Sequence, residues 1–364
     1  MSKIYRPTYV EIHLDHIRDN FLNVQKQLKN KQVIPVVKAN AYGHGSVEVV
    51  RILREVGVNF VAVSLLEEAL ELRNSFTDLD ILVMGVTSKD NFEVLEQSNI
   101  VFTVYDENHG KDVLMSNHKL RFHVKVDTGM NRLGYKALEE LSLFFNQVKS
   151  KKSLFLEGVY THFATSDSDA EYVHYQQARF EEILHALPYV PKCIHTSNSS
   201  AVLHYEKEMP YTTHARVGIL LYGLTLDKGI TFLKPAMKVK TKIMHMNNLV
   251  KHEKVSYNIT YEAPADEIIA VLPIGYADGL IRKNQGGMVS VNGKAYEIVG
   301  RICMDQTIIR VDESIHCGDD VIIMGDEIVS IDDVAKRLDT INYEVVCQIT
   351  SRVPRIYCKK EVLT

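Results

Sequence analysis

The fold is decided by the stretch VIPVVKANAYGHG, residues 33–45. Its first five residues form a short apolar run, which is typical of a parallel strand that is buried on both faces. The segment that follows lacks the G-x-G-x-x-G spacing with which a doubly wound dinucleotide-binding sheet usually opens. The stretch therefore indicates a buried parallel strand whose carboxyl end leads directly to Lys38.

Seven more apolar runs of this kind follow before residue 225, and most are separated by segments whose apolar positions recur every three or four residues. Eight strand–helix units predict a (β/α)8 barrel, whose active site lies at the carboxyl ends of the strands. A doubly wound open sheet is the alternative, but such a sheet usually has fewer strands. The expected strands are Val33–Val37, Phe60–Ser64, Ile81–Met84, Ile100–Val104, Phe122–Val126, Leu156–Tyr160, Lys192–Thr196 and Val217–Tyr222. The expected helices are Asp15–Gln27, Ser46–Val56, Leu65–Asn74, Lys136–Ser150 and Asp169–Ala186.

After Leu224 the pattern changes to short strands that alternate apolar and polar residues, with Gly, Asn and Asp between them. Such strands with tight turns predict a mostly β domain. A polar segment at Asp227–Thr231 marks the change, so we expect a barrel in residues 1–230 and a β-rich domain in residues 231–364. The expected strands are Met237–Met246, Ile268–Ile274, Met288–Val291, Tyr296–Val299, Thr307–Val311 and Val321–Met324, with a helix at Ile331–Leu338 that Ser330 caps.

The composition excludes several classes of function. The chain has 364 residues, with 42 basic and 46 acidic side chains and a formal charge of −4, and no long basic run. A role on nucleic acid or a membrane surface therefore has little electrostatic support. Met1–Thr8 lacks the apolar core of a signal peptide, and no apolar stretch reaches the roughly 20 residues of a membrane helix. The five cysteines are scattered without a CxxC pair, which favours reduced thiols in a cytoplasmic protein without a metal site.

Lys38 is the strongest candidate for chemistry. A lysine at the end of a barrel strand, flanked by small residues and partly desolvated, has a lowered pKa and becomes a usable amine. That is what Schiff-base formation with a carbonyl cofactor requires. A surface lysine in a loop is the plain alternative.

The motif around Lys38 resembles the pyridoxal-phosphate attachment motif of alanine racemases. The resemblance continues in order through both expected domains. The matching segments are VVKANAYGHG (36–45), KVDTGMNRLG (125–134), YTHFA (160–164), HTSNS (195–199), RVGILLYG (216–223), VSY (255–257), PIGYADG (273–279), GRICMDQ (300–306) and INYE (341–344).

The resemblance implies an enzyme that interconverts L-alanine and D-alanine with pyridoxal 5′-phosphate and supplies D-alanine for peptidoglycan. Lys38 would hold the cofactor and act as the base that removes the α-proton of D-alanine. Tyr257 of a partner chain would be the base for L-alanine on the opposite face of the cofactor. A homodimer with shared active sites follows. A free tyrosine has a pKa near 10, so Tyr257 needs a partner, and His162 is the candidate, in a relay with Arg216 and His195.

The resemblance also places Arg216 at the pyridine nitrogen of the cofactor. A guanidinium cannot accept a proton, so the ring nitrogen would stay unprotonated. An unprotonated pyridine ring is a weaker electron sink for the carbanion of the substrate, and this would favour racemisation over transamination. An arginine that makes a structural salt bridge is the alternative.

Further residues correspond to the phosphate and substrate contacts of the family. Barrels often bind phosphate with the loops after the seventh and eighth strands. The phosphate donors implied are Tyr42, Ser199, Tyr343 and the backbone amides of Gly218 and Ile219. The substrate contacts implied are Arg132 and the backbone amide of Met304 from the partner chain.

Two positions in this part of the sequence carry further expectations. Lys125 matches a lysine that is carbamylated in some family members. Asn131 stands where many relatives have glycine, and asparagine tolerates left-handed backbone angles better than most residues.

Four alternatives remain open from the sequence. A metal-dependent barrel hydrolase would use His123, His162 and His195, although no H-x-H ends the first strand and HExxH is absent. A pyridoxal-phosphate carrier without catalysis would resemble only the barrel part of this chain. A barrel-type amino-acid decarboxylase would share the lysine at position 38. A serine or broad-specificity racemase is the alternative most similar to an alanine racemase.

Overall fold

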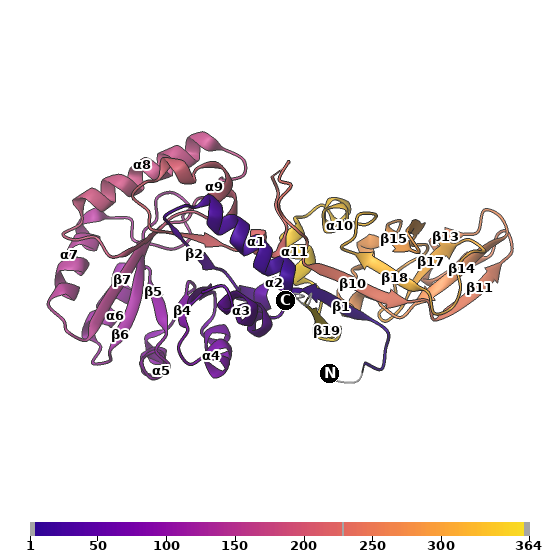
Figure 1. The fold of residues 1–364 in the computed structure, drawn as a ribbon, viewed down its shortest axis with the longest axis horizontal. Helices are drawn as coiled ribbons and strands as arrows, with labels where there is room; N and C mark the ends of the chain where they lie inside the picture. The colour runs from indigo at the N-terminus through magenta and orange to yellow at the C-terminus, as the bar shows by residue number, and fades with distance from the viewer. Residues whose placement is uncertain (1–3, 228, 360–364) are drawn as a thin grey trace, which may run out of the picture. The chain divides into compact units, whose positions relative to one another are not determined.

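The computed structural model describes residues 4–227 and 229–359. The chain divides into two compact units (Figure 1). One comprises Arg18–Ala41 and Ser46–Leu233, and we call it the barrel unit. The other comprises Met1–Ile17, Tyr42–Gly45 and Lys234–Thr364, and we call it the β unit.

The barrel unit contains eight parallel strands in the order β2-β9-β8-β7-β6-β5-β4-β3. A parallel bridge between Val36 and Ala62 joins the regions of β2 and β3 and closes the sheet on itself. This closure confirms the predicted barrel and excludes the open doubly wound sheet. The strands are β2 Gln32–Pro35, β3 Phe60–Val63, β4 Asp80–Val83, β5 Val101–Val104, β6 Leu120–Lys125, β7 Leu154–Tyr160, β8 Cys193–His195 and β9 His214–Val217.

Helices α3–α9 follow the barrel strands, as the connections between parallel strands require. Helices α5 and α6 were not expected, and of α9 only a start near Ser199 was; α5 and α9 have six residues each, too few to show a clear helical period. The helices are α1 Leu14–Gln27, α3 Ser46–Arg54, α4 Leu66–Ser75, α5 Phe92–Gln97, α6 Glu107–Met115, α7 Leu138–Lys149, α8 Ala170–Ala186 and α9 Ser199–His204.

The eighth barrel strand differs from the prediction. The apolar run Val217–Tyr222 was expected to be a strand, but β9 ends at Val217 and Ile219–Tyr222 forms a buried 3-10 helix. Gly218, with φ −111° and ψ −91°, leaves the extended conformation between them. Periodicity cannot separate a short buried strand from a buried helical turn. Arg216 therefore lies inside β9, which begins at His214.

The β unit contains a six-stranded sheet in the order β16-β15-β18-β10-β1-β19, a three-stranded sheet β11-β14-β17 and the pair β12-β13. The strands are β1 Tyr9–His13, β10 Met237–Lys242, β11 His245–Leu249, β12 Lys254–Val255, β13 Tyr261–Glu262, β14 Glu267–Leu272, β15 Met288–Val291, β16 Lys294–Glu297, β17 Thr307–Val311, β18 Asp320–Met324 and β19 Arg355–Cys358. Helix α10 spans Ile331–Leu338 and helix α11 spans Asn342–Cys347. The Ser330 side chain accepts a hydrogen bond from the Asp333 amide at 3.1 Å, which confirms the predicted cap.

Strand β1 shows that the two units do not divide at a single boundary near residue 230. It pairs antiparallel with β10 and parallel with β19, so Tyr9–His13 belong to the β unit. Val10 and Ile12 are fully buried in this sheet, while their neighbours are partly exposed. A five-residue strand that pairs with partners more than 220 residues away leaves only this weak alternation in the sequence.

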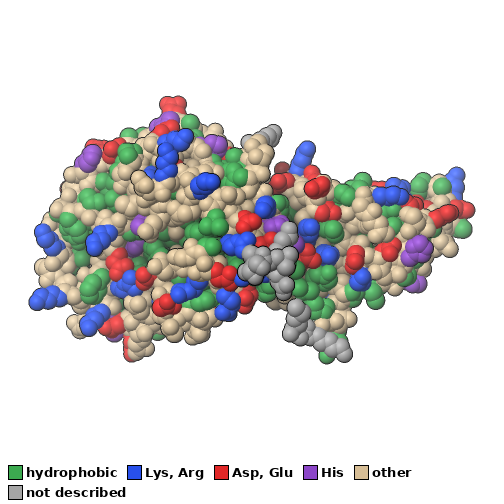
Figure 2. All heavy atoms as spheres, viewed as in Figure 1, with side chains coloured by type: hydrophobic (Ala, Val, Ile, Leu, Met, Phe, Trp, Pro, Cys, Tyr) green, Lys and Arg blue, Asp and Glu red, His purple; other side chains and the backbone are tan. Residues whose placement is uncertain are grey.

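The described surface carries charges of both signs. On the face shown in Figure 2, Lys and Arg side chains intermingle with Asp and Glu side chains, without a broad area of one sign. None of the helices in the described part of the chain combines the length and apolarity that crossing a bilayer would need.

Candidate active site

Lys38 begins a left-handed turn, the segment α2 Lys38–Tyr42, just beyond the carboxyl end of β2. Residues Ala39 to Tyr42 have φ values between 52° and 54°, although none of them is glycine. Such angles cost about 1–2 kcal/mol per residue. A strained turn at the end of a barrel strand persists only where neighbouring groups hold it, and such strain concentrates at functional sites.

Glu68 at the start of α4 holds this turn in the barrel unit. Its Oε1 atom accepts a hydrogen bond from the Ala39 amide at 2.6 Å, and its Oε2 atom accepts from the Ser64 and Leu65 amides at 2.9 and 3.1 Å. The Asn40 side chain accepts a hydrogen bond from the Ser46 amide at 2.8 Å. Sequence reasoning missed Glu68, and the only signal was a glutamate in the first turn of a predicted helix.

Arg216 lies on β9, beside the strand that leads to Lys38, and its Cα pairs with Ile34 of β2. Its side chain is 3% exposed and donates to three backbone carbonyls, those of Thr161, His195 and Thr196, at 2.8–3.0 Å. Burial lowers the pKa of Arg216 to about 10, so the guanidinium stays charged at neutral pH. The buried cation is thus stabilised by carbonyl dipoles and hydrogen-bonds to no carboxylate among the described residues.

Arg216 also binds two histidines and thereby sets their tautomers. It donates from Nη1 to His195 Nδ1 at 2.6 Å and from Nη2 to His162 Nδ1 at 3.1 Å. Burial, followed by the charge of Arg216, lowers the pKa of both histidines well below the ordinary range, so both rings are neutral. Because Nδ1 accepts in each ring, each neutral ring carries its proton on Nε2.

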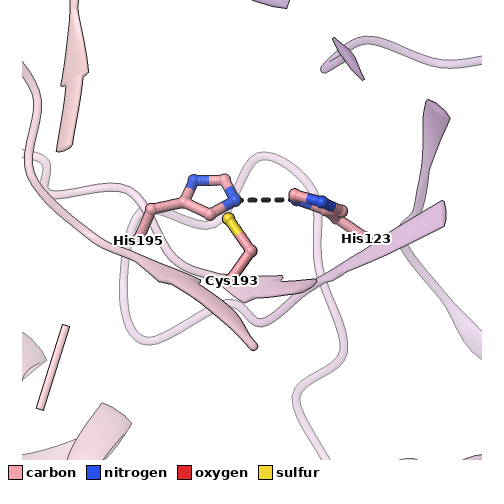
Figure 3. Close-up of side chains that lie close together, drawn as sticks. All are labelled: His123, Cys193 and His195. Atoms are coloured by element: carbon pink, nitrogen blue, oxygen red, sulfur yellow. Dashed lines mark hydrogen bonds between the residues drawn. The ribbon is translucent and has the colours of Figure 1, made fainter. Parts of the chain in front are cut away.

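The relay extends one residue beyond the expected set. His195 Nε2 lies 2.9 Å from His123 Nδ1 (Figure 3), so His195 is the donor and His123 the acceptor of this bond. The His195 ring also stacks on Tyr160, with 4.5 Å between the centroids and 10° between the planes. The Tyr160 hydroxyl in turn lies 2.9 Å from the Thr103 hydroxyl. His195 is therefore held by Arg216, His123 and Tyr160 together.

Lys125 lies at the end of β6, close to the same group. Its side chain is buried, and its amine has no hydrogen-bond partner in the described structure. Burial, together with the charge of Arg216, lowers the pKa of Lys125 to about 8. A buried amine with this pKa is partly neutral near physiological pH, which is the reactive form of an amine.

The loops after β6, β8 and β9 carry the remaining barrel residues of the predicted site. Ser199 is the first residue of α9, and its hydroxyl accepts a hydrogen bond from the Gly218 amide at 3.0 Å. Arg132 is exposed in the loop after β6. The neighbouring Asn131 adopts φ 56°, which agrees with its expected tolerance of a left-handed backbone. Asp127 shapes this loop by accepting from the Gly129 and Asn131 amides, each at 3.0 Å.

The other predicted site residues belong to the β unit. Tyr42 and Tyr343 lie with their ring centroids 6.1 Å apart. Tyr257 and Met304 are 67% and 53% exposed. The loops that carry Tyr257 and Met304 are tied together, since Ser256 Oγ donates to the Arg301 carbonyl at 2.6 Å.

The predicted residues thus fall into two groups, one in each unit. The structure brings His162, Arg216 and His195 into direct contact, places Gly218 against Ser199, and pairs Tyr42 with Tyr343. Arg216 occupies the Nδ1 atoms of both His162 and His195, so these rings could meet another group only through Nε2.

A closed parallel (β/α)8 barrel with a lysine just beyond its first strand, together with a β-rich unit, places the chain among two-domain barrel proteins. The family model of the alanine racemase N-terminal domain matches residues 12–226, and that of the C-terminal domain matches residues 236–357. The chain therefore belongs to the alanine racemase family.

Relatives match over nearly the full length. An alanine racemase from Listeria monocytogenes is 42% identical, covering 97% of this chain and 98% of the relative. The crystal structure of an alanine racemase from E. faecalis superimposes with a TM-score of 0.92 at 37% identity, covering 97% of this chain and 99% of that one. A histidine racemase from Leuconostoc mesenteroides superimposes with a TM-score of 0.90 at 26% identity, covering 98% of each chain. The fold therefore accommodates racemases for more than one amino acid.

Proposed function

We propose that this chain is a pyridoxal-phosphate-dependent racemase that interconverts L-alanine and D-alanine. The observation that carries the proposal is the Arg216 group, a buried guanidinium held on two neutral histidines beside the strand that leads to Lys38. Full-length similarity to alanine racemases supports the same activity. In this proposal the enzyme supplies D-alanine for peptidoglycan.

The donor set of the barrel unit fits the cofactor. Lys38 offers an amine at the end of the first barrel strand, and Ser199 and Ile219 offer a hydroxyl and an amide donor for a phosphate after β8 and β9. The Gly218 amide, which we assign to the same phosphate, donates to Ser199 Oγ in this structure. The Ser199 hydroxyl accepts from Gly218, so its own proton is available for donation. Tyr42 and Tyr343 are assigned to the same phosphate. When bound, pyridoxal phosphate supplies the electron sink that stabilises negative charge at the α-carbon of the substrate.

In this proposal Arg216 determines how strongly the pyridine ring of the cofactor withdraws electrons. Its two terminal nitrogens make the five contacts described above, so we assign its Nε to the pyridine nitrogen. The guanidinium has no lone pair and no proton to give at neutral pH. The ring nitrogen would then stay unprotonated, which favours return of the proton to the α-carbon and disfavours transamination.

Two bases on opposite faces account for inversion at the α-carbon. Lys38 takes the proton on one face, and Tyr257 of a partner chain returns one on the other face. Neutral His162 carries its proton on Nε2, so its role toward Tyr257 is to donate a hydrogen bond that stabilises the phenolate. Arg132 and the Met304 amide hold the substrate carboxylate, for which a fork of N–H donors is suited.

A homodimer with shared active sites is part of the proposal. Tyr257 and Met304 are exposed in the single chain, as is Ile259 at 58%, on linked loops of the β unit. Three residues around Tyr257 have left-handed backbone angles, namely Ser256, Asn258 and Ile259. Exposed apolar side chains on a strained loop are typical of a surface that a partner covers. In this proposal residues 231–364, most of which belong to the β unit, complete the partner's site, while residues 1–230 bind the cofactor.

The test is racemisation by the purified chain loaded with pyridoxal phosphate. We expect D-alanine formation from L-alanine, measured with a D-amino-acid oxidase, with kcat/KM for alanine at least ten-fold above those for serine and histidine. Equal kcat/KM values for alanine and serine would support the alternative of a broad-specificity racemase. Absence of alanine racemisation with bound cofactor would overturn the proposal.

A further inference from the structure

A second cluster of reactive side chains lies at the opposite end of the barrel from Lys38. The amino-terminal ends of the strands surround a cavity of about 830 Å3. Residues at the beginning of six strands line it, namely Gln32, Phe60, Asp80, Arg121, Cys193 and His214. His123, deeper in β6, lines it as well. The mechanism proposed above uses none of these residues directly.

The strand register brings His123 and Cys193 together across a glycine. His123 of β6 pairs with Gly158 of β7, and Gly158 pairs with Cys193 of β8. A Cβ atom on Gly158 would lie 2.6 Å from the His123 ring, so only glycine leaves room for the imidazole. Figure 3 shows the Cys193 sulfur beside the hydrogen bond that joins His195 to His123.

The ligating atoms in this cluster are close enough to surround one ion. One ligand atom each from His123, Cys193 and His195 lies within 4.8 Å of the other two. His214 adds a further ring nitrogen, with its Nδ1 3.4 Å from the Cys193 sulfur. Neighbouring ligands of a tetrahedral zinc ion, with bonds of about 2.0–2.3 Å, lie roughly 3.3–3.8 Å apart. The His123, Cys193 and His195 side chains therefore need only small rotations to share a cation, and His214 would have to turn toward them to become the fourth ligand.

We propose that His123, Cys193, His195 and His214 form a binding site for one thiophilic divalent cation of the zinc type. Imidazole and thiolate are the ligands that such ions prefer. The open cavity gives the ion a path from solvent to the cluster. All four ligands belong to the barrel unit, so the site is complete within one chain.

Binding requires a proton to move, because the thiolate is the form of cysteine that binds a metal. Cys193 therefore gives up its thiol proton to solvent when the metal–sulfur bond forms, and one proton is released per cation.

His195 connects this site to the active site. A neutral ring that binds a metal through Nε2 carries its proton on Nδ1. In the structure His195 Nδ1 accepts from Arg216 Nη1 at 2.6 Å. Two N–H groups cannot occupy that contact, so metal binding and the Arg216–His195 hydrogen bond exclude each other. The cation would therefore act as an inhibitor from the far end of the barrel.

The binding test uses Co2+ as a spectroscopic probe of the full-length chain, without substrate. We expect one Co2+ per chain with a thiolate-to-cobalt charge-transfer band, which an equivalent of Zn2+ removes. Cys193→Ser should abolish the band, and His214→Gln should weaken Co2+ binding at least ten-fold. The matched control is Cys317→Ser, which changes an exposed cysteine and should leave the band intact. A wild-type chain without the band, or a Cys193→Ser chain that keeps it, overturns the site.

The coupling test compares racemisation with and without one equivalent of Zn2+, and this arm alone rests on the proposed function. We expect kcat to fall several-fold in the wild-type chain and to stay unchanged in Cys193→Ser. Nitrogen NMR of the histidine rings should show the His195 proton move from Nε2 to Nδ1 on zinc binding, whether or not the chain racemises alanine. Bound zinc without this tautomer change overturns the link to Arg216.

Discussion

The carboxylate of Glu68 accepts a hydrogen bond from the Ala39 amide at 2.6 Å, at the first residue of the left-handed turn beside Lys38. The same carboxylate accepts from the Ser64 and Leu65 amides. One side chain on α4 therefore holds the turn after the first strand and the loop after the second. The strain of the turn is offset in part by these charge-assisted bonds.

Glu68→Ala should destabilise the barrel and loosen the Lys38 turn. Three backbone amides lose their acceptor, and about 2–3 kcal/mol of unfolding free energy is the expected loss. We also expect pyridoxal phosphate to bind at least ten-fold more weakly. Urea unfolding and cofactor titration would measure the two effects, with the exposed Glu67→Ala as the control. Equal stability of the two variants would contradict this role.

Lys38→Ala should abolish covalent attachment of the cofactor, because no other amine is proposed to bond to it. Borohydride treatment of the loaded wild-type chain should fix the cofactor on the peptide that contains Lys38, as mass spectrometry would show. Lys26→Ala, which changes an exposed lysine on α1, should behave like wild type. Labelling that persists in Lys38→Ala would remove this residue from its role.

Tyr257→Phe should impair proton exchange on L-alanine far more than on D-alanine. The change removes the phenolic oxygen and keeps the ring, so only the base on one face is lost. Solvent deuterium incorporation into each enantiomer, followed by NMR, would measure the asymmetry, and a loss of 100-fold or more is expected for L-alanine. Tyr175→Phe, at an exposed tyrosine of α8, serves as the control. Equal losses for both enantiomers are incompatible with two bases.

Arg216→Glu should raise the ratio of transamination to racemisation. A carboxylate can hold the pyridine nitrogen protonated, which strengthens the electron sink. The variant also leaves buried carbonyls without their donor, so a stability loss of about 3–5 kcal/mol is expected. Arg216→Lys, which keeps the positive charge, separates the two effects. Pyruvate formation per racemisation event is the measurement, and an unchanged ratio in Arg216→Glu would refute the account of the ring nitrogen.

Lys125 should make stability depend on pH in the alkaline range. Its pKa is lowered from 10.5 to about 8 in the folded chain, so the unfolded chain binds more protons between these values. Unfolding free energy therefore rises as pH increases from about 8 to 10.5, by about 3 kcal/mol in total. Lys125→Met should remove this rise. Urea unfolding from pH 7 to 10 in carbon dioxide-free buffer would test it, since a carbamate on Lys125 would change the titrating group.

Local patterns account for the elements that the sequence predicted well. Strands β15 and β17 and helix α10 have the boundaries that were expected, because alternation or a capping serine marks each of them within a few residues. Lys38 was recognisable because an apolar run ends just before it. The family resemblance then predicted roles for Arg216 and His162, which local patterning alone would have left as ordinary polar residues.

Long-range packing decided the rest. The pairing of β1 with β10 and β19, the helical turn at Ile219–Tyr222 and the support of Ala39 by Glu68 all depend on groups that meet only after folding. The tautomers of His162, His195 and His123 depend on one guanidinium that reaches them through the barrel interior. A sequence specifies which donors and acceptors exist. Which of them share a hydrogen bond is set by distances of about 3 Å between strands far apart in the chain, and only the closed barrel supplies those distances.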